Sequence, residues 1–208
     1  MDNNLKNRDK LISCAKKEFL EKGFMKASLR QISSDAGLTT GAVYFFFKDK
    51  NGLFGAVVGD VLERIMKVIL DHFNSDAETD ISAYQPQKGD HDAFAEDLVA
   101  EMYDNYDTMM ILLDRSQGSE YADIAERFVD ITDKFYNEIA HKYAELMPGK
   151  KVNMYMLHWM SHMEIDAFIH LLHHVQDKDT ALKQVKPMLE YFTKGWLEYI
   201  LEDENEEE

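Results

Sequence analysis

The sequence of 208 residues predicts an all-α protein with a small N-terminal domain and a larger C-terminal domain. Apolar residues recur at three- and four-residue spacing through most of the chain, which is the period of helices. Only three prolines and ten glycines interrupt this pattern. No segment shows the apolar-polar alternation that predicts a strand.

Charge is divided unevenly along the chain. The net charge is -16, but residues 1–59 carry +4 and residues 60–208 carry -20. Because phosphate binding needs local positive charge, the basic N-terminal part remains compatible with nucleic acid despite the acidic average. The single cysteine, Cys14, cannot form an internal disulfide and is a poor candidate for a catalytic thiol.

Targeting signals and membrane spans are not predicted. The N-terminus lacks the charged-then-apolar order of a signal peptide, and no apolar run is long enough to cross a bilayer. We therefore expect a cytoplasmic protein without a membrane partner.

The first helix is predicted over residues 7–22. Its apolar residues share one face, and Gly23 then supplies a stop signal. The apolar positions are Leu11, Ile12, Ala15, Phe19 and Leu20.

A second helix is predicted over residues 29–36, with Ile32 and Ala36 facing inward. Ser28 stands three residues before Gln31, and this spacing is typical of a capping box at a helix N-terminus.

A third helix is predicted to follow a tight turn at Gly37 and to end near Phe47. Thr39 or Thr40 can cap its N-terminus. Two short helices joined by a glycine turn form a helix-turn-helix, here at residues 28–47.

Three consecutive phenylalanines occupy the third helix. At 100° per residue, Phe46 and Phe47 share a face with Val43, whereas Phe45 points to the opposite side. An exposed aromatic residue there can enter a major groove and contact a thymine methyl group. The alternative is that Phe45 covers a contact between protein chains.

A fourth helix is predicted over residues 50–73, followed by a polar loop at 74–92. Further helical patterns cover residues 93–113, 119–146, 151–175 and 179–202. The predicted domains are therefore residues 1–55 and residues 56–202, followed by a solvated acidic tail at residues 203–208.

The segment "SLRQISSDAGLTTGAVYFFFKDKNGLF" resembles the DNA-binding signature of the tetracycline-repressor (TetR/AcrR) family. The resemblance covers about the first 55 residues, and the remainder follows the family only in length and helical pattern. The matching positions are Ile32, Ala36, Gly37, Tyr44, Phe47, Lys50 and Leu53.

The resemblance implies a homodimer whose two helix-turn-helix domains enter successive major grooves of a palindromic operator. Tyr44 and Lys50 would then hold phosphates, whereas Ser28 and Arg30 would anchor the start of the second helix. Lys48 belongs to the same predicted surface. The residues predicted to approach bases are Thr39, Thr40, Gly41 and Phe45.

One departure from the family pattern concerns the residues after Tyr44. Where the family often has histidine or another polar residue, this chain has Phe45 and Phe46. Sequence recognition would then depend more on methyl contacts and less on hydrogen bonds.

Two segments of the C-terminal domain, residues 102–113 and 155–172, are rich in methionine and aromatic residues. The resemblance implies an effector pocket there, and methionine adapts to irregular ligands. The alternative is ordinary core packing. The residues predicted to contact a small hydrophobic effector are Met102, Tyr106, Met109, Trp159 and Met163.

Two acidic residues interrupt the second of these segments. Glu164 and Asp166 could pair with a cationic effector or could face water. The sequence leaves both readings open.

A row of histidines and one aspartate repeats every four residues in the same helix. The row turns by 40° at each step, so its members cannot converge on one ion. No metal or cofactor is therefore predicted, although an ion shared across a dimer face stays an alternative. The members are His158, His162, Asp166, His170 and His174.

The sequence thus predicts a ligand-responsive transcriptional regulator, a repressor released from its operator by a small molecule, with no catalytic residues. One alternative is a DNA-binding protein of the same fold that acts through a protein partner and has no small effector. A second is a metalloenzyme that uses the histidine row, which leaves the helix-turn-helix unexplained.

Overall fold

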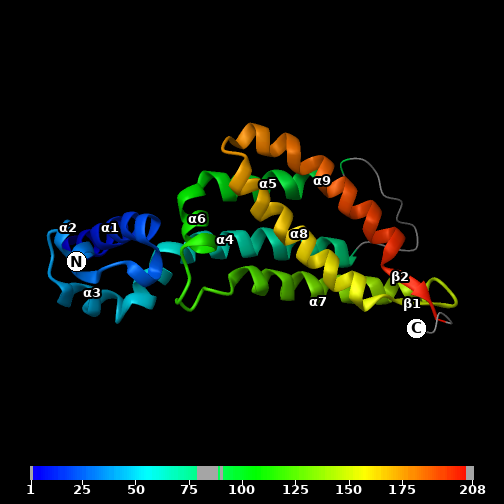
Figure 1. The fold of residues 1–208 in the computed structure, drawn as a ribbon, viewed down its shortest axis with the longest axis horizontal. Helices are drawn as coiled ribbons and strands as arrows, with labels where there is room; N and C mark the ends of the chain where they lie inside the picture. The colour runs from blue at the N-terminus through cyan, green and yellow to red at the C-terminus, as the bar shows by residue number, and fades with distance from the viewer. Residues whose placement is uncertain (1, 79–88, 90, 205–208) are drawn as a thin grey trace. The chain divides into compact units, whose positions relative to one another are not determined.

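The computed structural model describes residues 2–78, 89 and 91–204. These residues form helices joined by short connections, and one pair of strands (Figure 1). The elements are α1 (Asp2–Lys26), α2 (Leu29–Asp35), α3 (Thr40–Phe47), α4 (Lys50–Glu78), α5 (Asp92–Asp104), α6 (Tyr106–Asp114), α7 (Ile124–Glu145), β1 (Lys150–Val152), α8 (Met154–His174), α9 (Lys178–Tyr199) and β2 (Leu201–Asp203).

The chain divides into two compact units. The N-terminal unit contains residues 1–64 and 104–124, and the C-terminal unit contains residues 65–103 and 125–208. This division differs from the predicted boundary at residue 55 because α4 continues from one unit into the other. It also places α6, which packs against α1, in the N-terminal unit.

The core of the N-terminal unit is built from aromatic and aliphatic residues. The Phe19 ring meets the Phe54 ring edge-on, with 4.9 Å between centroids, and both side chains are fully buried. Gly23, the predicted helix stop, has a positive φ of 70° and interrupts α1. After this break, the Phe24 N–H donates to the carbonyl oxygen of Arg115 at 2.7 Å.

The start of α2 matches the predicted cap in part. The Ser28 hydroxyl accepts a hydrogen bond from the Gln31 N–H at 3.3 Å. The Gln31 side chain, however, donates to Asp35 instead of returning to the cap. The buried carboxylate of Glu18 accepts the Ser28 N–H at 3.0 Å, so α1 supplies the second half of the capping interaction.

The turn between α2 and α3 contains Gly37 at a φ of 69°, as its predicted role requires. Thr39 occupies the N-cap position of α3, but its side chain makes no capping hydrogen bond. Ile32 and Ala36 are buried, which confirms the predicted inner face of the second helix.

The predicted helix over residues 93–113 is two helices in the structure. Asn105, with φ -121° and ψ 30°, separates α5 from α6. Its side-chain oxygen accepts a hydrogen bond from the Arg64 guanidinium at 3.3 Å. The break lies next to the boundary between the two units, since residues up to 103 belong to the C-terminal unit and residues 104–124 to the N-terminal unit.

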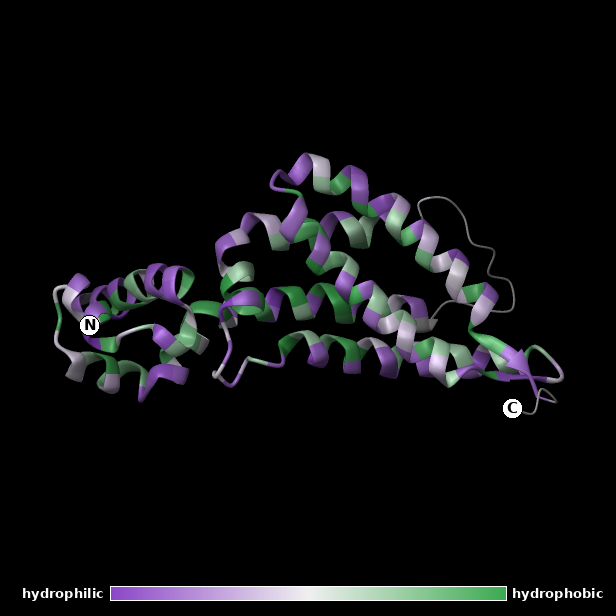
Figure 2. Cartoon of the chain, viewed as in Figure 1, coloured by the Kyte–Doolittle hydropathy of each residue, from purple (hydrophilic) through white to green (hydrophobic). Residues whose placement is uncertain are grey.

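The C-terminal unit packs the second half of α4 with α5, α7, α8 and α9. The Phe73 and Phe135 rings stack at 4.7 Å between α4 and α7. The Tyr103 hydroxyl donates to the carbonyl oxygens of Leu171 and Val175, which ties α5 to the end of α8. In Figure 2, hydrophobic and hydrophilic residues of α7 lie on opposite sides of the helix.

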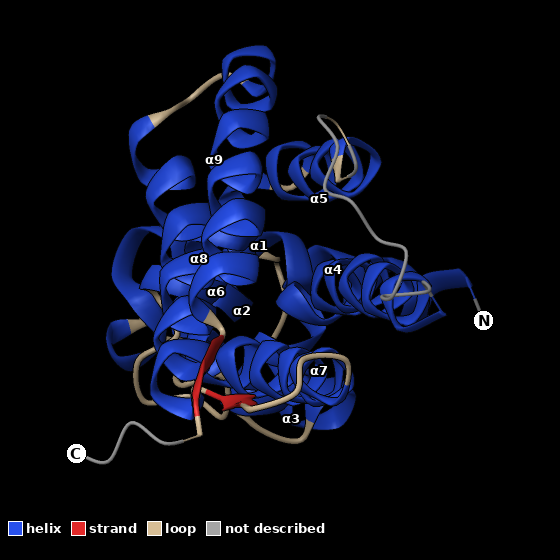
Figure 3. Cartoon of the chain, turned by 90° about the vertical axis from the view of Figure 1, so that its right-hand side faces the viewer, coloured by secondary structure: helices blue, strands red, loops and turns tan. Residues whose placement is uncertain are grey.

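Two strands were not predicted from the sequence. β1 and β2 pair antiparallel, with Val152 opposite Leu201, and lie together at the C-terminal end of the fold (Figure 3). Lys150 forms an ion pair with Asp203 at 2.8 Å, so the predicted acidic tail begins in a strand. Three residues are too few for alternation to be recognised in a sequence.

Parts of two predicted segments lie outside the described residues. For the predicted loop at 74–92, α4 continues through residue 78 and α5 begins at Asp92, whereas residues 79–88 and 90 are not described. Residues 205–208 of the tail are not described either. Among the described residues, no helix is both long and apolar enough to cross a membrane.

Candidate functional site

The first candidate site is the outer face of α3. Val43 and Phe47 are buried and Phe46 is half-buried, so these three residues hold the helix on the core. Tyr44 and Phe45 are 56% and 75% exposed. The arrangement agrees with the 100° spacing used in the prediction, and it leaves two adjacent aromatic side chains available to a partner.

The other residues predicted to contact DNA surround this aromatic pair in the sequence, at the starts of α2 and α3 and in the turn before α4. Lys48 has a φ of 72°, a left-handed conformation that few residues with a Cβ adopt. Thr40 and Lys50 are half-buried. The exposed members are Ser28, Arg30, Thr39, Gly41 and Lys48.

A buried carboxylate supports this surface from behind. Glu18 accepts hydrogen bonds from the Lys22 ammonium at 2.9 Å and from the Ser28 N–H at 3.0 Å. Burial acts to raise the pKa of Glu18, but these two hydrogen bonds outweigh it, and the pKa is lowered overall. Glu18 is therefore an ionised anchor for the start of α2.

The second candidate site is a cavity of about 340 Å³ within the C-terminal unit. Helices α4, α5, α7, α8 and α9 all contribute to its wall. Eight of the fourteen lining residues are apolar residues, tyrosine or tryptophan, and the other six carry polar or ionisable side chains. The lining residues are His72, Ser75, Asp76, His91, Phe94, Tyr136, Ile139, Met160, Glu164, Leu189, Phe192, Thr193, Trp196 and Leu197.

Glu164 is a buried acid in this wall. It accepts a hydrogen bond from the Tyr136 hydroxyl. Burial and the nearby charge of Asp76 raise the pKa of Glu164 to about 7, although the Tyr136 hydrogen bond acts in the opposite direction. Of the two acids left open by the sequence, Glu164 lines the cavity and Asp166 is exposed.

Trp196 contributes a hydrogen-bond donor to the cavity wall. Its indole Nε1 is buried and has no acceptor among the described residues. Buried donors are normally satisfied, so an unpaired one in a cavity wall indicates a position for a ligand acceptor.

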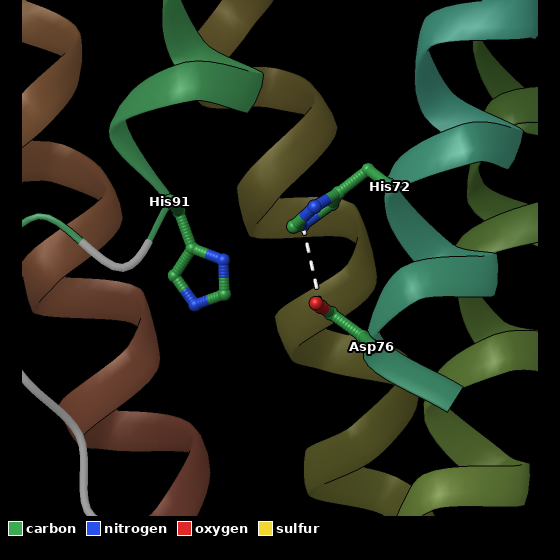
Figure 4. A group of neighbouring side chains, drawn as sticks. All are labelled: His72, Asp76 and His91. Atoms are coloured by element: carbon green, nitrogen blue, oxygen red, sulfur yellow. Dashed lines mark ion pairs between the residues drawn. The ribbon is translucent and has the colours of Figure 1, made fainter. Parts of the chain in front are cut away.

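His72, Asp76 and His91 form a polar group at the cavity, and Figure 4 shows the two imidazole rings and the carboxylate close together. The His72 Nε2 lies 3.4 Å from the Asp76 Oδ2. The His72 ring stacks on Phe94 at 4.0 Å, and the His91 ring lies nearly perpendicular at 5.1 Å. Burial, and to a smaller extent His91, lower the pKa of His72 to about 4.

Sequence reasoning missed this group. The four-residue spacing of His72 and Asp76 on α4 was the available signal. His91 adjoins them only through the fold, because it precedes α5 and lies 15 positions after Asp76.

None of the five residues predicted to contact an effector lines the cavity. Met102 and Met109 are buried in the cores, and Tyr106 is half-buried. Trp159 and Met163 are 44% and 36% exposed. In α8, the neighbouring Met160 and Glu164 are the residues that turn toward the cavity.

The histidine row of α8 lies on the surface and forms two separate pairs. The His158 and His162 rings are 4.6 Å apart, and the His170 and His174 rings are 4.1 Å apart. The His158 Nδ1 also lies 2.6 Å from the Asp133 Oδ2. The row therefore does not assemble into one site within the chain, as the drift of 40° per step predicts.

The helix-turn-helix region has relatives among known proteins. Residues 11–57 match the family described as "Bacterial regulatory proteins, tetR family". The HTH-type transcriptional repressor BepR of Brucella suis is 38% identical over 52 residues. This match covers 25% of the present chain and 25% of BepR, so it spans only a quarter of each protein.

Similar solved structures extend over nearly the whole chain. A transcriptional regulator of the TetR/AcrR family from Aquifex aeolicus superimposes with a TM-score of 0.59 at 18% identity, covering 89% of this chain and 98% of that one. NalD of Pseudomonas aeruginosa gives a TM-score of 0.54 at 21% identity, covering 96% and 99%. At these identities the likeness shows the fold. The match over residues 11–57 shows that the helix-turn-helix region is similar to the N-terminal region of that family.

Proposed function

We propose that the chain is a homodimeric transcriptional repressor that binds a palindromic operator through α2 and α3 and releases it when a small molecule occupies the cavity. The observation that carries this proposal is the exposure of Tyr44 and Phe45 on a helix whose opposite face is buried. An exposed aromatic pair is costly to leave in water unless a partner covers it.

Positive charge around the aromatic pair supports a nucleic-acid partner. Lys48 and Arg30 are exposed near the two ends of the helix-turn-helix, and residues 1–59 carry a net charge of +4 in a strongly acidic chain. Lysine and arginine provide the contacts that position a protein on phosphates, whereas the exposed face of α3 reads base edges.

The C-terminal cavity supports regulation by a small molecule. Its volume of about 340 Å³ lies in the range of drug-sized ligand pockets, and its aromatic wall suits an apolar body. The unpaired Trp196 N–H favours a ligand that carries a hydrogen-bond acceptor. We infer a small, largely apolar effector with at least one acceptor.

Exposed apolar side chains on the last two helices support a homodimer. Two packed helices that present large aromatic residues to water form a typical surface for a four-helix interface between chains. The residues are Tyr155, Trp159, Met163, Tyr191 and Tyr199, which are between 36% and 78% exposed.

BepR and NalD are named as repressors, and NalD as the secondary repressor of a multidrug efflux pump. We extend the repressor role, but not the regulated genes, to this chain. A repressor acts where the chromosome is, so we assign the chain to the cytoplasm, and we assign it no catalytic activity.

Selection of binding sites from a random library of DNA duplexes tests the proposal. We expect an enriched inverted repeat with half-sites about one helical turn apart, because each chain of a symmetric dimer reads one half-site. A Tyr44→Ala/Phe45→Ala double variant should lose the enrichment while it keeps the wild-type thermal stability. If the wild type enriches no repeat, the proposal is rejected.

A ligand screen tests the alternative that the protein binds DNA but has no small effector. Compounds that fill the cavity should raise the midpoint of thermal unfolding, because a ligand that binds only the folded state stabilises it. If no apolar compound does so and the repeat is still enriched, the protein binds DNA but is regulated through a protein partner.

A further inference from the structure

We propose that His72, Asp76 and His91 bind one divalent transition-metal ion of the zinc class, with the remaining coordination position open to the cavity. Each residue offers one ligand atom, and the three atoms lie within 4.8 Å of one another. Figure 4 shows the His72 ring and the Asp76 carboxylate approaching each other from one helix, while His91 approaches from a separate segment.

The spacing of two of the ligands already fits an ion. A tetrahedral zinc ion with bonds of about 2.0 to 2.1 Å holds its ligand atoms about 3.3 Å apart. The separation of the His72 Nε2 and the Asp76 Oδ2 is 3.4 Å. This match follows from their positions four residues apart on α4, which place both side chains on one face.

The third ligand needs a small movement. The distance of up to 4.8 Å must shorten to about 3.3 Å, which the two side-chain torsions of His91 can provide. His91 is partly exposed and precedes α5, so its ring is not fixed by the core.

The neighbouring rings hold His72 in place for this role. Phe94 stacks on the His72 imidazole with an interplanar angle of 12°, and the His72 Nε2 then faces Asp76. Ligand residues whose orientation is set by packing bind a metal more tightly than mobile ones. Phe94 lies in the first turn of α5 and His91 immediately precedes this helix, so one short segment supplies both the packing and the third ligand.

The donor set selects the class of ion. Two imidazole nitrogens and one carboxylate oxygen suit zinc and similar transition metals, whereas calcium and magnesium prefer sets made of oxygen. The cavity favours a cation as well, because the Asp76 carboxylate lies in its wall. Within the described part of the chain, none of its lining residues is lysine or arginine.

Three protein ligands leave a fourth position vacant in a tetrahedral site. Because His72, Asp76 and His91 all line the cavity, this position faces its interior. Water or a donor atom of a small molecule can complete it. The inference goes beyond the proposed function, because metal binding is measurable without DNA and without an effector.

The test is a titration of the full-length protein, stripped of metal by a chelator, with zinc by calorimetry and with cobalt(II) by visible absorption. We expect one ion per chain at this site, with the cobalt bands of a site of low coordination number. His91→Gln and Asp76→Asn should each weaken binding by at least about tenfold. Thermal unfolding of the metal-free variants shows whether they remain folded, and His91→Gln is the safer variant because His91 is partly exposed.

The matched control is a His162→Gln/His174→Gln double variant, which removes one member of each surface histidine pair on α8. It should keep the wild-type affinity and cobalt spectrum. The inference is overturned if His91→Gln and Asp76→Asn bind zinc as tightly as the wild type. It is also overturned if the control variant abolishes binding, because the ion would then belong to the surface row.

Discussion

The ammonium group of Lys50 lies 4.8 Å from the centre of the Phe24 ring and 3.4 Å from the carbonyl oxygen of Met25. These contacts join the first turn of α4 to the end of α1. Desolvation lowers the pKa of Lys50, although the charge of Glu18 acts to raise it. Lys50 therefore stabilises the N-terminal unit, in addition to the phosphate contact predicted from the sequence.

Lys50→Ala should produce two effects. The free energy of unfolding should fall by about 1 kcal/mol, because a cation-π contact and a hydrogen bond are lost. Affinity for DNA should fall for all sequences, and the dependence of log K on log salt should become shallower by about one unit. Denaturant unfolding and fluorescence anisotropy over a range of salt concentrations measure the two effects.

Lys48→Gly is the comparison for this prediction. Glycine adopts a positive φ without the steric cost of a Cβ, so the change removes an exposed charge with little strain at residue 48. Its stability should stay close to that of the wild type. A Lys50→Ala variant with reduced stability but an unchanged salt slope would show that Lys50 is structural and touches no phosphate.

Phe45→Ala should affect DNA binding without affecting stability. The side chain is 75% exposed, so its removal leaves the midpoint of unfolding nearly unchanged. Affinity should fall by about 1 kcal/mol at operators with thymine at the contacted step and less at other operators. Binding to a panel of operator variants measures this difference, and a uniform loss over the panel would contradict a role in reading bases.

Phe47→Ala provides the contrast two positions along the same helix. Phe47 is 7% exposed and packs in the core of the N-terminal unit. Its truncation should cost about 3 to 5 kcal/mol of stability, as for other buried phenylalanines.

The elements with local signals could be predicted from the sequence. Ser28 caps the second helix and the following turn contains Gly37, as predicted, because caps and glycine turns depend on residues a few positions apart. The burial of Val43 and exposure of Phe45 follow from helical period alone. The break at Asn105 had no such signal, since it depends on which unit each half of the segment joins.

The cavity could not be predicted because its wall comes from five helices. In α8, Trp159 and Met160 are adjacent and both apolar, yet the first is exposed and the second lines the cavity. Composition alone cannot choose between two such faces when both are apolar. The same limit applies to His72 and His91, which meet only because α5 returns alongside the end of α4.

The raised pKa of Glu164 should appear in the pH dependence of the free energy of unfolding. Its pKa of about 7 in the folded chain exceeds the ordinary value of 4.5, so the folded chain holds a proton that the unfolded chain releases between these values. The free energy of unfolding therefore falls as pH rises from about 4.5 to 7, and Glu164 contributes roughly 3 kcal/mol of this fall. Above pH 7 the contribution of Glu164 no longer changes with pH. Glu164→Gln should remove this fall.

Urea unfolding at pH 5 and pH 8 tests the prediction, with a chelator present and the protein concentration fixed. Glu164→Gln should lose less stability than the wild type between the two pH values. Asp166→Asn, at an exposed position on the same helix, should behave as the wild type. Equal losses in Glu164→Gln and the wild type would show that Glu164 is ionised in the folded state.

Trp159→Glu should dissociate the proposed dimer. Trp159 is 44% exposed on α8, between Tyr155 and Met163 on the same stripe, and a carboxylate there would be buried without a partner in an interface. Light scattering should change from twice the chain mass to the chain mass. The control is His141→Glu, which adds a charge at an exposed position of α7 and should stay dimeric. A wild type that is monomeric at micromolar concentration would exclude the dimer itself.

Ile139→Trp should separate effector binding from DNA binding. Ile139 lines the cavity and takes no part in the N-terminal unit, so a larger side chain fills space that a ligand needs. The variant should bind the selected operator with wild-type affinity. Compounds that raise the unfolding midpoint of the wild type should have no effect on it, and should no longer displace it from DNA.

Coupling between the two sites must also be reciprocal. Helix α4 starts at Lys50 in the N-terminal unit and carries the cavity residue Asp76 near its other end. A ligand in the cavity can therefore act on α3 through this one continuous helix. An inducer must bind the DNA-free state more tightly, by on the order of 1 to 3 kcal/mol. Operator DNA must then weaken the binding of the same ligand by the same factor. Calorimetric titration of the ligand with and without operator measures both affinities, and equal values would mean that the ligand occupies the cavity without being an inducer.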